Sequence, residues 1–168
     1  MTKSSAVNAP DSPVASKSLS TSASSFLVHA ESLVVQTDQR IELIDLTERI
    51  GAIVAASGVR EGLVSLWSMH TTLAVFMNES QQALHADITR LLEQIVDRDA
   101  DWKHNDPEHS DCDRFNADAH LRAMLLGHSL SLQVSGSRLV LGQWQRVLVA
   151  ELDGPRARTV RVQAMGTA

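Results

Sequence analysis

The spacing of apolar residues changes along this chain, and that change constrains the fold more than any other feature. From Gln82 onward, apolar residues recur at helical spacing and predict one helix of about four turns, at Leu84, Ile88, Leu91, Leu92, Ile95 and Val96. Segments rich in β-branched and aliphatic residues lie on both sides of it and predict strands, at residues 26–37, 40–46, 63–69, 73–77, 130–134, 138–141, 147–152 and 158–163. The chain therefore combines one long helix with many short strands.

Two shorter helical segments complete the predicted elements. Apolar residues at helical spacing follow Thr47, a suitable N-cap, and this helix is expected to end at Gly58. Asn116 is a suitable cap for a second short helix, which is expected to end at Gly127. This pattern predicts an α+β domain with a mainly antiparallel sheet or sandwich and two or three helices.

Length and composition favour a single globular domain. The chain has 168 residues, of which 43% are hydrophobic, and this is enough for one domain with a substantial core. Residues 1–25 are rich in Ser, Ala and Thr and contain too little apolar surface to offset the entropy of ordering, so we expect a disordered tail. The folded domain is then expected over residues 26–168.

Charge and apolar run length argue against two classes of partner. The formal net charge of -5 at pH 7 disfavours a broad nucleic-acid surface, which needs clustered Lys and Arg. No apolar run approaches the roughly 20 residues that span a bilayer, so no membrane partner is expected. Cys112 is the single cysteine and cannot form an intrachain disulfide, which favours a reducing, cytoplasmic setting.

An acidic segment over residues 97–115 separates the long helix from the last short one. It contains six aspartates and Pro107 and has no apolar period, which predicts a long irregular loop. Long loops in compact domains are usually functional or mobile. Because acidic neighbours disfavour the thiolate, we interpret Cys112 as a loop cysteine rather than a nucleophile.

Three histidines are candidates for a metal site. His70 follows a predicted strand, His104 lies in the acidic loop, and His120 lies on the predicted short helix. Neutral imidazoles that converge on an open position suit Zn²⁺ or a similar ion and leave room for water or substrate. The chain has no HExxH or HxH pattern to bring them together locally, and a hydrogen-bonded packing role is the more common one for each.

Glu151 and Asp153 are candidates for acid, base or cation-binding roles. They lie two residues apart on a predicted strand, so their carboxylates leave the same face. Two such carboxylates can share a cation or divide acid and base roles. The alternative for Asp153 is an ordinary turn, because Asp-Gly-Pro favours one and Asp153 can then bond its own backbone.

Two further pairs each have a functional and a structural interpretation. Asn78 and Glu79 end the strand before the long helix, where they can belong to a site or cap that helix. Arg156 and Arg158 share one face and can hold a phosphate bidentately or balance the acidic surface. The chain has no GxxxxGK[ST] loop, which excludes a nucleotide triphosphate site of that type.

Four ordered sequence blocks resemble the signature blocks of the YjbQ family, often labelled secondary thiamine-phosphate synthase. The blocks are HTTLAVFMNE at residues 70–79, NADAHLRAMLLG at 116–127, GSRLVLGQWQ at 136–145 and ELDGPRARTV at 151–160. The resemblance covers roughly residues 26–166. Four blocks in order are far more specific than any one of them.

The resemblance implies a compact α+β domain that assembles as a homotrimer, with pockets near subunit boundaries and a metal-binding histidine set. By position, the matching histidines are His70, His104 and His120, with a divalent ion as cofactor, Zn²⁺ or, for pyrophosphate chemistry, Mg²⁺. The other polar signature positions are Asn78, Glu79, Asn116, Asp118, Gln145, Glu151, Asp153 and Arg156. Trp102 departs from the pattern, which places Tyr there, two residues before His104.

The activity attributed to the family is a weak condensation of an aminopyrimidine pyrophosphate with a thiazole phosphate. For similar chemistry we expect catalytic roles at Asn78, Glu79, Glu151 and Asp153. We expect contacts with a phosphorylated small-molecule substrate at Asn116, Asp118, Gln145, Arg156 and Arg158. Two alternatives remain open, a metal-dependent hydrolase on the same pocket and a non-catalytic trimeric binding module.

Overall fold

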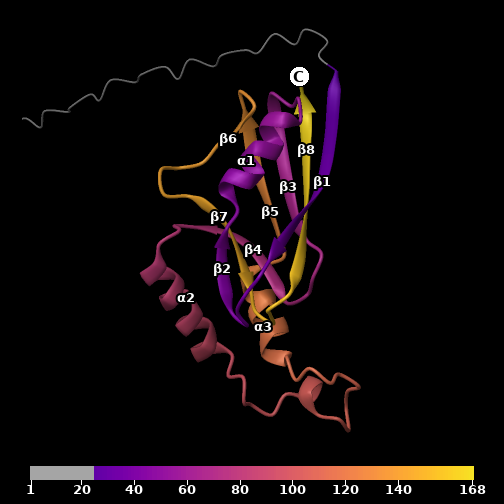
Figure 1. The fold of residues 1–168 in the computed structure, drawn as a ribbon, viewed down its shortest axis with the longest axis vertical. Helices are drawn as coiled ribbons and strands as arrows, with labels where there is room; N and C mark the ends of the chain where they lie inside the picture. The colour runs from indigo at the N-terminus through magenta and orange to yellow at the C-terminus, as the bar shows by residue number, and fades with distance from the viewer. Residues whose placement is uncertain (1–24) are drawn as a thin grey trace, which may run out of the picture.

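A computed structural model describes residues 25–168 (Figure 1). The helices are α1 (Thr47–Ala56), α2 (Gln82–Ile95), α3 (Ala117–Leu126) and a 3-10 turn, η1 (Lys103–Asn105). The strands are β1 (Phe26–Gln36), β2 (Glu42–Asp45), β3 (Glu61–Ser68), β4 (Leu73–Asn78), β5 (Ser129–Ser135), β6 (Arg138–Leu139), β7 (Arg146–Glu151) and β8 (Ala157–Thr167). The tail predicted over residues 1–25 lies outside the described residues, except for Ser25.

The strands form two antiparallel sheets. The larger sheet has the order β1-β8-β3-β5-β6, and the smaller has the order β2-β7-β4. Each strand pair in the described residues is antiparallel. The predicted α+β class with mainly antiparallel sheets and three helices is therefore confirmed.

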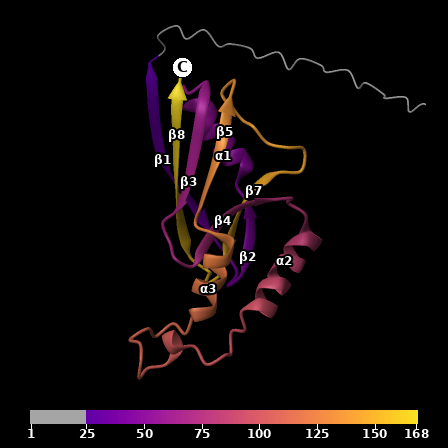
Figure 2. The same cartoon turned by 180° about the vertical axis from the view of Figure 1, so that it is seen from behind.

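Two apolar clusters divide these elements into layers. The larger cluster lies between the two sheets and against α1, and the smaller lies between the small sheet and helices α2 and α3. Strand β7 contributes to both because alternate side chains point to opposite faces, with Val147 and Val149 in the first cluster and Ala150 in the second. Figure 2 shows α2 on the far side of the small sheet from the five-stranded sheet.

The long helix is confirmed, but the small sheet covers only part of its apolar stripe. Ile88 and Leu92 are buried, whereas Leu91 and Ile95 are 53% and 58% exposed. The irregular segment that follows contains only the short turn η1 among the described elements, as the lack of apolar period predicts. No helix within residues 25–168 is long and apolar enough to cross a membrane.

Both predicted N-cap interactions are wrong in detail. Helix α1 has Leu46 at its cap position, and the hydroxyl of Thr47 instead accepts the backbone N–H of Val147 at 2.8 Å. Asn116 does occupy the cap position of α3, but its side chain donates to Asp153 rather than bonding the helix. In both cases a tertiary partner replaces the local one.

The register of β4 against β7 decides where the polar segments lie. Leu73 pairs with Glu151 at one end of the two strands, and Asn78 pairs with Arg146 at the other. The segment before β4, His70–Thr72, therefore lies beside the end of β7. With a rise of about 3.3 Å per residue, the two ends are roughly 17 Å apart.

Candidate functional site

Three chain segments meet at the end of β7 and form a polar pocket of about 290 Å³. They are the segment before β4, the start of α3, and the turn between β7 and β8. The lining residues are Met69, His70, Thr71, Thr72, Asn116, His120, Asp153, Arg156 and Arg158. Six residues singled out from the sequence are thus brought together, namely His70, Asn116, His120, Asp153, Arg156 and Arg158.

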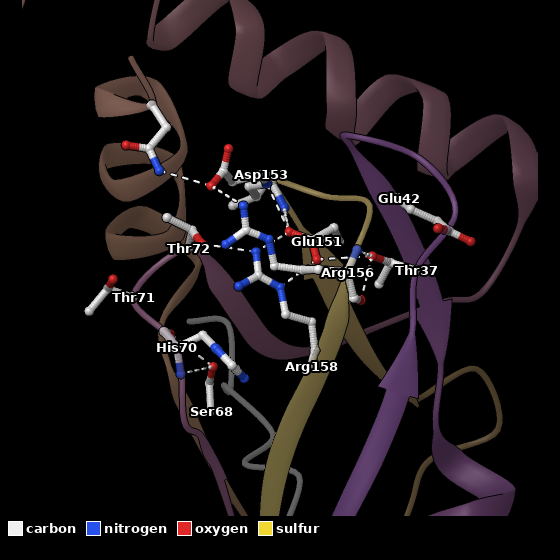
Figure 3. Close-up of polar contacts among 12 residues, drawn as sticks. Thr37, Glu42, Ser68, His70, Thr71, Thr72, Glu151, Asp153, Arg156 and Arg158 are labelled. Atoms are coloured by element: carbon white, nitrogen blue, oxygen red, sulfur yellow. Dashed lines mark hydrogen bonds and ion pairs between the residues drawn. The ribbon is translucent and has the colours of Figure 1, made fainter. Parts of the chain in front are cut away.

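A buried ion pair between Glu151 and Arg158 forms the base of this polar pocket (Figure 3). Glu151 shares its face of β7 with Val149, and Arg158 shares its face of β8 with Val160, so both side chains enter the space between the sheets. Their exposed fractions are 0% and 1%. Arg158 donates to both carboxylate oxygens through Nε and Nη2, a bidentate arrangement. Because an unpaired buried charge is strongly destabilising, each group requires the other.

Further donors engage both oxygens of the Glu151 carboxylate. Oε1 accepts the backbone N–H groups of Leu152 at 2.9 Å and Asp153 at 2.8 Å, and Oε2 accepts the hydroxyl of Thr37 at 3.1 Å. The same hydroxyl oxygen accepts the backbone N–H of Arg156 at 2.9 Å. Glu151 therefore fixes the turn after β7, and it lies behind the lining residues of the pocket rather than among them.

Asp153 is the point at which three nitrogen donors converge. Its Oδ2 accepts Nε of Arg114 at 2.9 Å, Nδ2 of Asn116 at 2.9 Å and Nη2 of Arg156 at 3.0 Å. These donors come from the acidic loop, the start of α3 and the turn itself. Among the described residues no side chain bonds Oδ1, which leaves this oxygen as an acceptor for a ligand.

His70 lines the pocket as a neutral ring with a defined tautomer. Its Nε2 lies 2.9 Å from the backbone N–H of Thr159 and accepts it, so the neutral ring carries its proton on Nδ1. Burial lowers the pKa of His70, and the Arg158 cation lowers it further, whereas the Glu151 carboxylate raises it. His70 can therefore donate a hydrogen bond from Nδ1, but its Nε2 lone pair is already used.

His104 and His120 lie next to one another at the side of the pocket. Their ring centroids are 4.9 Å apart with an interplanar angle of 82°. Burial lowers the pKa of His120 and the neighbouring His104 lowers it further, against the opposing effects of Asp153 and Asp118. His120 is consequently a neutral imidazole at pH 7.

The predicted histidine set is only partly assembled. Two of its rings, those of His104 and His120, are adjacent, and the third, that of His70, has Nε2 engaged by the backbone. No group of three or more His, Cys, Asp or Glu in residues 25–168 is arranged to hold a metal ion. A metal ion held by His70, His104 and His120 therefore stays a prediction from the resemblance.

Asp118 lies beneath the pocket rather than in contact with it. Its fully buried carboxylate accepts Nη2 of Arg40 at 2.9 Å and lies 3.0 Å from Nη1 of Arg122. Arg122 also donates to the carbonyl of Val96 at 2.8 Å. Asp118 therefore ties α3 to the end of α2 and to the segment after β1, and its role as a substrate contact stays a prediction.

The remaining predicted residues lie at the opposite end of β4 and β7. Asn78, Glu79 and Gln145 are exposed, and their bonds are local. Oδ1 of Asn78 accepts the N–H of Glu79 at 2.9 Å, and Oε1 of Gln145 accepts the N–H of Gly142 at 2.8 Å. Glu79 lines a separate hollow of about 290 Å³ with Trp144. The strand register thus divides the predicted residues between two regions.

Three residues that hold the charged groups of the pocket were assigned no role from the sequence. They are Thr37, Thr72 and Arg114. Thr72 accepts Nη2 of Arg158 at 2.9 Å, and its only sequence signal was its place beside His70. Thr37 and Arg114 lie 114 and 39 residues from the carboxylates that they contact, so no local pattern could mark them.

The sequence of this chain is similar to those of UPF0047 proteins. The profile of a family described as UPF0047 protein YjbQ-like matches residues 31–167. A UPF0047 protein of Methanothermobacter thermautotrophicus is 41% identical over 139 residues, which cover 83% of this chain and 93% of that protein. The UPF0047 protein YugU of Bacillus subtilis is 30% identical over 137 residues, which cover 81% of this chain and 98% of that protein.

Solved structures share the same fold. A YbjQ-like protein of unknown function from Sulfolobus solfataricus has a TM-score of 0.78 at 33% identity, and the match covers 84% of this chain and 99% of that one. A hypothetical protein from Aeropyrum pernix has a TM-score of 0.75 at 36% identity, with 82% and 98% covered. The sequence and structure comparisons therefore agree.

Proposed function

The chain belongs to the YjbQ-like family, and from this premise we propose that its polar pocket binds a phosphorylated small molecule and supports group transfer of the thiamine-phosphate synthase type. The proposal combines the activity that the resemblance implies with the charge and geometry of the pocket. The single observation that carries it is a local excess of positive charge.

That excess contrasts with the charge of the whole chain. The chain has a formal net charge of -5, but the residues that line the pocket carry two arginine cations, Arg156 and Arg158, and one carboxylate, that of Asp153; behind the lining, Arg114 and Glu151 add one charge of each sign. Since the two histidines that line the pocket have lowered pKa values and are neutral at pH 7, the balance of these groups is one positive charge. A site with this balance favours an anionic ligand.

Arg156 is the group best placed to contact such an anion. It lines the pocket and is half-buried, and only its Nη2 bonds a carboxylate among the described residues. Its Nη1 remains available to a phosphate oxygen. The Arg158 side chain is less free to reorient, because its Nε and Nη2 already donate to Glu151 and Thr72. It therefore contributes positive charge to the pocket rather than new hydrogen bonds to a ligand.

These residues can assist a displacement at carbon. The bond from the aminopyrimidine methylene carbon to the pyrophosphate oxygen breaks, and the bond from that carbon to the thiazole nitrogen forms. The departing pyrophosphate keeps the electron pair, and Arg156 together with Arg158 stabilises the developing negative charge. Because the nucleophile is a neutral nitrogen, the reaction needs no strong base, which suits a pocket whose Glu151 is fully engaged.

Neutral polar groups would position the two reactants. The Nδ1–H of His70 is a donor at one side of the pocket, and His120 offers a neutral imidazole at the other. Oδ1 of Asp153 can accept a hydrogen bond from an exocyclic amine. A divalent ion, if bound by His104 and His120, would add positive charge near the leaving group, but none of the steps above depends on it.

A homotrimer is part of the proposal. Its support is an apolar stripe on the outer face of the five-stranded sheet, where Val28, Leu63 and Trp67 are 60%, 47% and 56% exposed. Apolar stripes of this kind commonly mark contacts with another protein surface. Met69 and His70 continue from the end of β3 into the polar pocket, so a subunit on this stripe would approach the pocket.

Calorimetric titration with inorganic pyrophosphate tests the anion site. We expect Arg156→Ala to weaken binding about 10-fold or more, because a hydrogen bond to a charged group contributes about 1.5–3 kcal/mol. Arg90→Ala, an exposed arginine on α2, is the matched control and should leave the affinity unchanged. Equal affinities for wild type and Arg156→Ala, or no binding by wild type, would overturn the proposed site.

Activity is tested separately by incubating the wild-type protein with the aminopyrimidine pyrophosphate and the thiazole phosphate. The transferase proposal is supported if wild type forms thiamine phosphate, if Arg156→Ala forms it more slowly, and if Arg90→Ala forms it at the wild-type rate. Binding of pyrophosphate with no product would replace the transferase by a binding module. Release of inorganic phosphate without condensation would replace it by a hydrolase.

A further inference from the structure

The hollow of about 290 Å³ at the exposed end of β4 and β7 is separate from the polar pocket and has a different chemistry. The loop between β6 and β7 meets the end of β2 and the segment that leads into α2 there (Figure 1). We call it the Trp144 hollow, and its lining residues are Asp45, Glu79, Ser80, Gln143, Trp144 and Arg146. It shares no lining residue with the polar pocket. The Trp144 hollow is therefore a candidate site of its own.

Two of the three charged side chains in this lining are paired with each other. Oδ2 of Asp45 accepts Nε of Arg146 at 2.8 Å, and Oδ1 accepts the backbone N–H of Thr47 at 2.8 Å. Nη2 of Arg146 also donates to Glu48 at 3.3 Å. Burial raises the pKa of Asp45, but the hydrogen bonds from Thr47 and Arg146 outweigh burial and lower it. Asp45 is thus charged at pH 7, and two carboxylates balance the Arg146 cation.

Glu79 is the charged side chain of the hollow that has no partner in the described part of the chain. Its backbone N–H is donated to Asn78, but its carboxylate accepts no hydrogen bond there and forms no ion pair. Because Arg146 is already balanced by its own partners, the carboxylate of Glu79 sets the charge preference of the hollow. The hollow therefore favours a cation, whereas the polar pocket at the other end of the strands favours an anion.

Trp144 adds an aromatic face to the same hollow. Its side chain is 64% exposed, although the turn that carries it is closed by two hydrogen bonds. The N–H of Gln145 is donated to the carbonyl of Gly142 at 3.0 Å, and the N–H of Gly142 to the Gln145 side chain at 2.8 Å. An indole face attracts a cation through the negative charge of its π system, and a planar guanidinium can also stack on it.

We propose that the Trp144 hollow binds a guanidinium group, which stacks on the indole of Trp144 and pairs with the carboxylate of Glu79. The two interactions are compatible, because a guanidinium offers its edge N–H groups to a carboxylate while its face lies on a ring. An ammonium group is more strongly hydrated and cannot stack in this way. The volume of the hollow suits a fragment of this size rather than a whole drug-sized ligand. The inference does not depend on the proposed function.

Methylguanidinium and methylurea have nearly the same shape and differ by one charge, so together they isolate the preference for a cation. Each is titrated into the full chain at millimolar concentration and followed by NMR through the backbone amide signals of Gly142–Arg146. We expect wild type to bind methylguanidinium about 10-fold more tightly than methylurea. Glu79→Gln should reduce this ratio to about 3, the preference that the indole alone supplies, and Trp144→Ala should weaken methylguanidinium binding about 3-fold.

Control variants separate this site from the acidity of the whole chain and from a loss of structure. Glu93→Gln removes an exposed carboxylate near the far end of α2 and should leave the ratio unchanged. Trp144→Phe retains a ring and should bind methylguanidinium more tightly than Trp144→Ala. Since Glu79 and Trp144 are exposed, their variants should fold, as circular dichroism verifies. If Trp144→Ala fails to fold, the wild-type ratio and Glu79→Gln still decide the question.

A capped tripeptide with a central arginine distinguishes two sources of the guanidinium. Affinity equal to that of methylguanidinium supports an arginine side chain of another protein, and affinity about 10-fold weaker supports a free small molecule. The proposal is overturned if wild type binds methylguanidinium and methylurea equally or binds neither, or if the full ratio survives in Glu79→Gln. None of these results affects the anion site at Arg156, which pyrophosphate tests separately.

Discussion

The two ends of the β4–β7 strand pair carry similar residues in opposite environments. At the end near Glu151, charged side chains are buried between the sheets and bond to segments far away in sequence. At the end near Arg146, the residues Asn78, Glu79 and Gln145 are exposed and bond within one to three residues. Composition alone therefore does not distinguish a pocket from a solvated strand end.

Burial explains why the two ends behave differently. Between the sheets, the carboxylate of Glu151 cannot exchange its partners for water, so Arg158, Thr37 and two backbone N–H groups must satisfy it. At the exposed end water can replace any of these bonds, and a lost contact costs little. We therefore expect substitutions at the buried end to lower the unfolding free energy much more than substitutions at the exposed end.

Glu151→Gln should have the largest effect. The substitution keeps the shape of the side chain but removes the charge, which leaves the Arg158 guanidinium buried without a counter-charge. Breaking a buried pair in this way typically costs about 3–5 kcal/mol of unfolding free energy. Urea denaturation followed by circular dichroism measures it, and a loss below about 1 kcal/mol would contradict the structural role.

A double substitution sharpens this test. Glu151→Leu combined with Arg158→Met removes both charges at once, and buried pairs replaced by apolar residues are often neutral or more stable. We expect the double variant to be more stable than Glu151→Gln. A double variant as unstable as the single one would show that the hydrogen bonds of Glu151 to the turn, rather than its charge, hold the pocket.

His70→Gln should have a smaller, pH-dependent effect. Burial and Arg158 lower the pKa of His70, and its neutral Nε2 accepts the N–H of Thr159. The unfolded chain therefore binds a proton at His70 more readily than the folded one, so the stability that His70 contributes is complete above about pH 6.5 and is lost as pH falls through the lowered pKa.

Glutamine can retain an acceptor near the position of Nε2 but does not titrate. Wild type should therefore lose stability more steeply than His70→Gln between pH 7 and pH 5, as measured by urea denaturation at several pH values. His120 titrates in both proteins and cancels in the comparison. Parallel stability curves for the two proteins would contradict the assignment of His70 as a neutral acceptor.

Glu79→Gln should have the smallest effect. Glu79 is exposed, and the removal of its charge leaves no buried partner unsatisfied. We expect the unfolding free energy to stay within about 0.5 kcal/mol of wild type. Because this is the same substitution as Glu151→Gln, the pair of variants measures the difference between the two strand ends directly, and a loss above about 1 kcal/mol at Glu79 would remove that difference.

Much of the local structure could be predicted from the sequence. The apolar spacing located α1 and α2, the cap and end signals at Asn116 and Gly127 located α3, and the segments of β-branched residues located the strands, because all these signals come from neighbours within a few residues. The N-cap of α1 was wrong, since Thr47 bonds Val147 across the fold. The spacing also did not show how far the α2 stripe is covered, and two of its six apolar residues, Leu91 and Ile95, are exposed.

The candidate site was predicted only in part. His70, Asn116, His120, Asp153, Arg156 and Arg158 meet in one pocket, whereas Glu79 lies at the far strand end. The sequence suggested that Glu151 and Asp153 act as a pair on one face. In the structure each is held by its own set of donors, Arg158 and Thr37 for Glu151 and three nitrogen donors for Asp153.

The amino-acid sequence by itself determined the class of fold, the order of helices and strands, and the chemical types present at the pocket. Only the tertiary structure decided which carboxylates are buried partners and which are exposed, because that depends on strand register. Pairing of Leu73 with Glu151 places His70 beside Arg158 and moves Asn78 to the other end. Register is a property of two strands at once, so no single segment contains it.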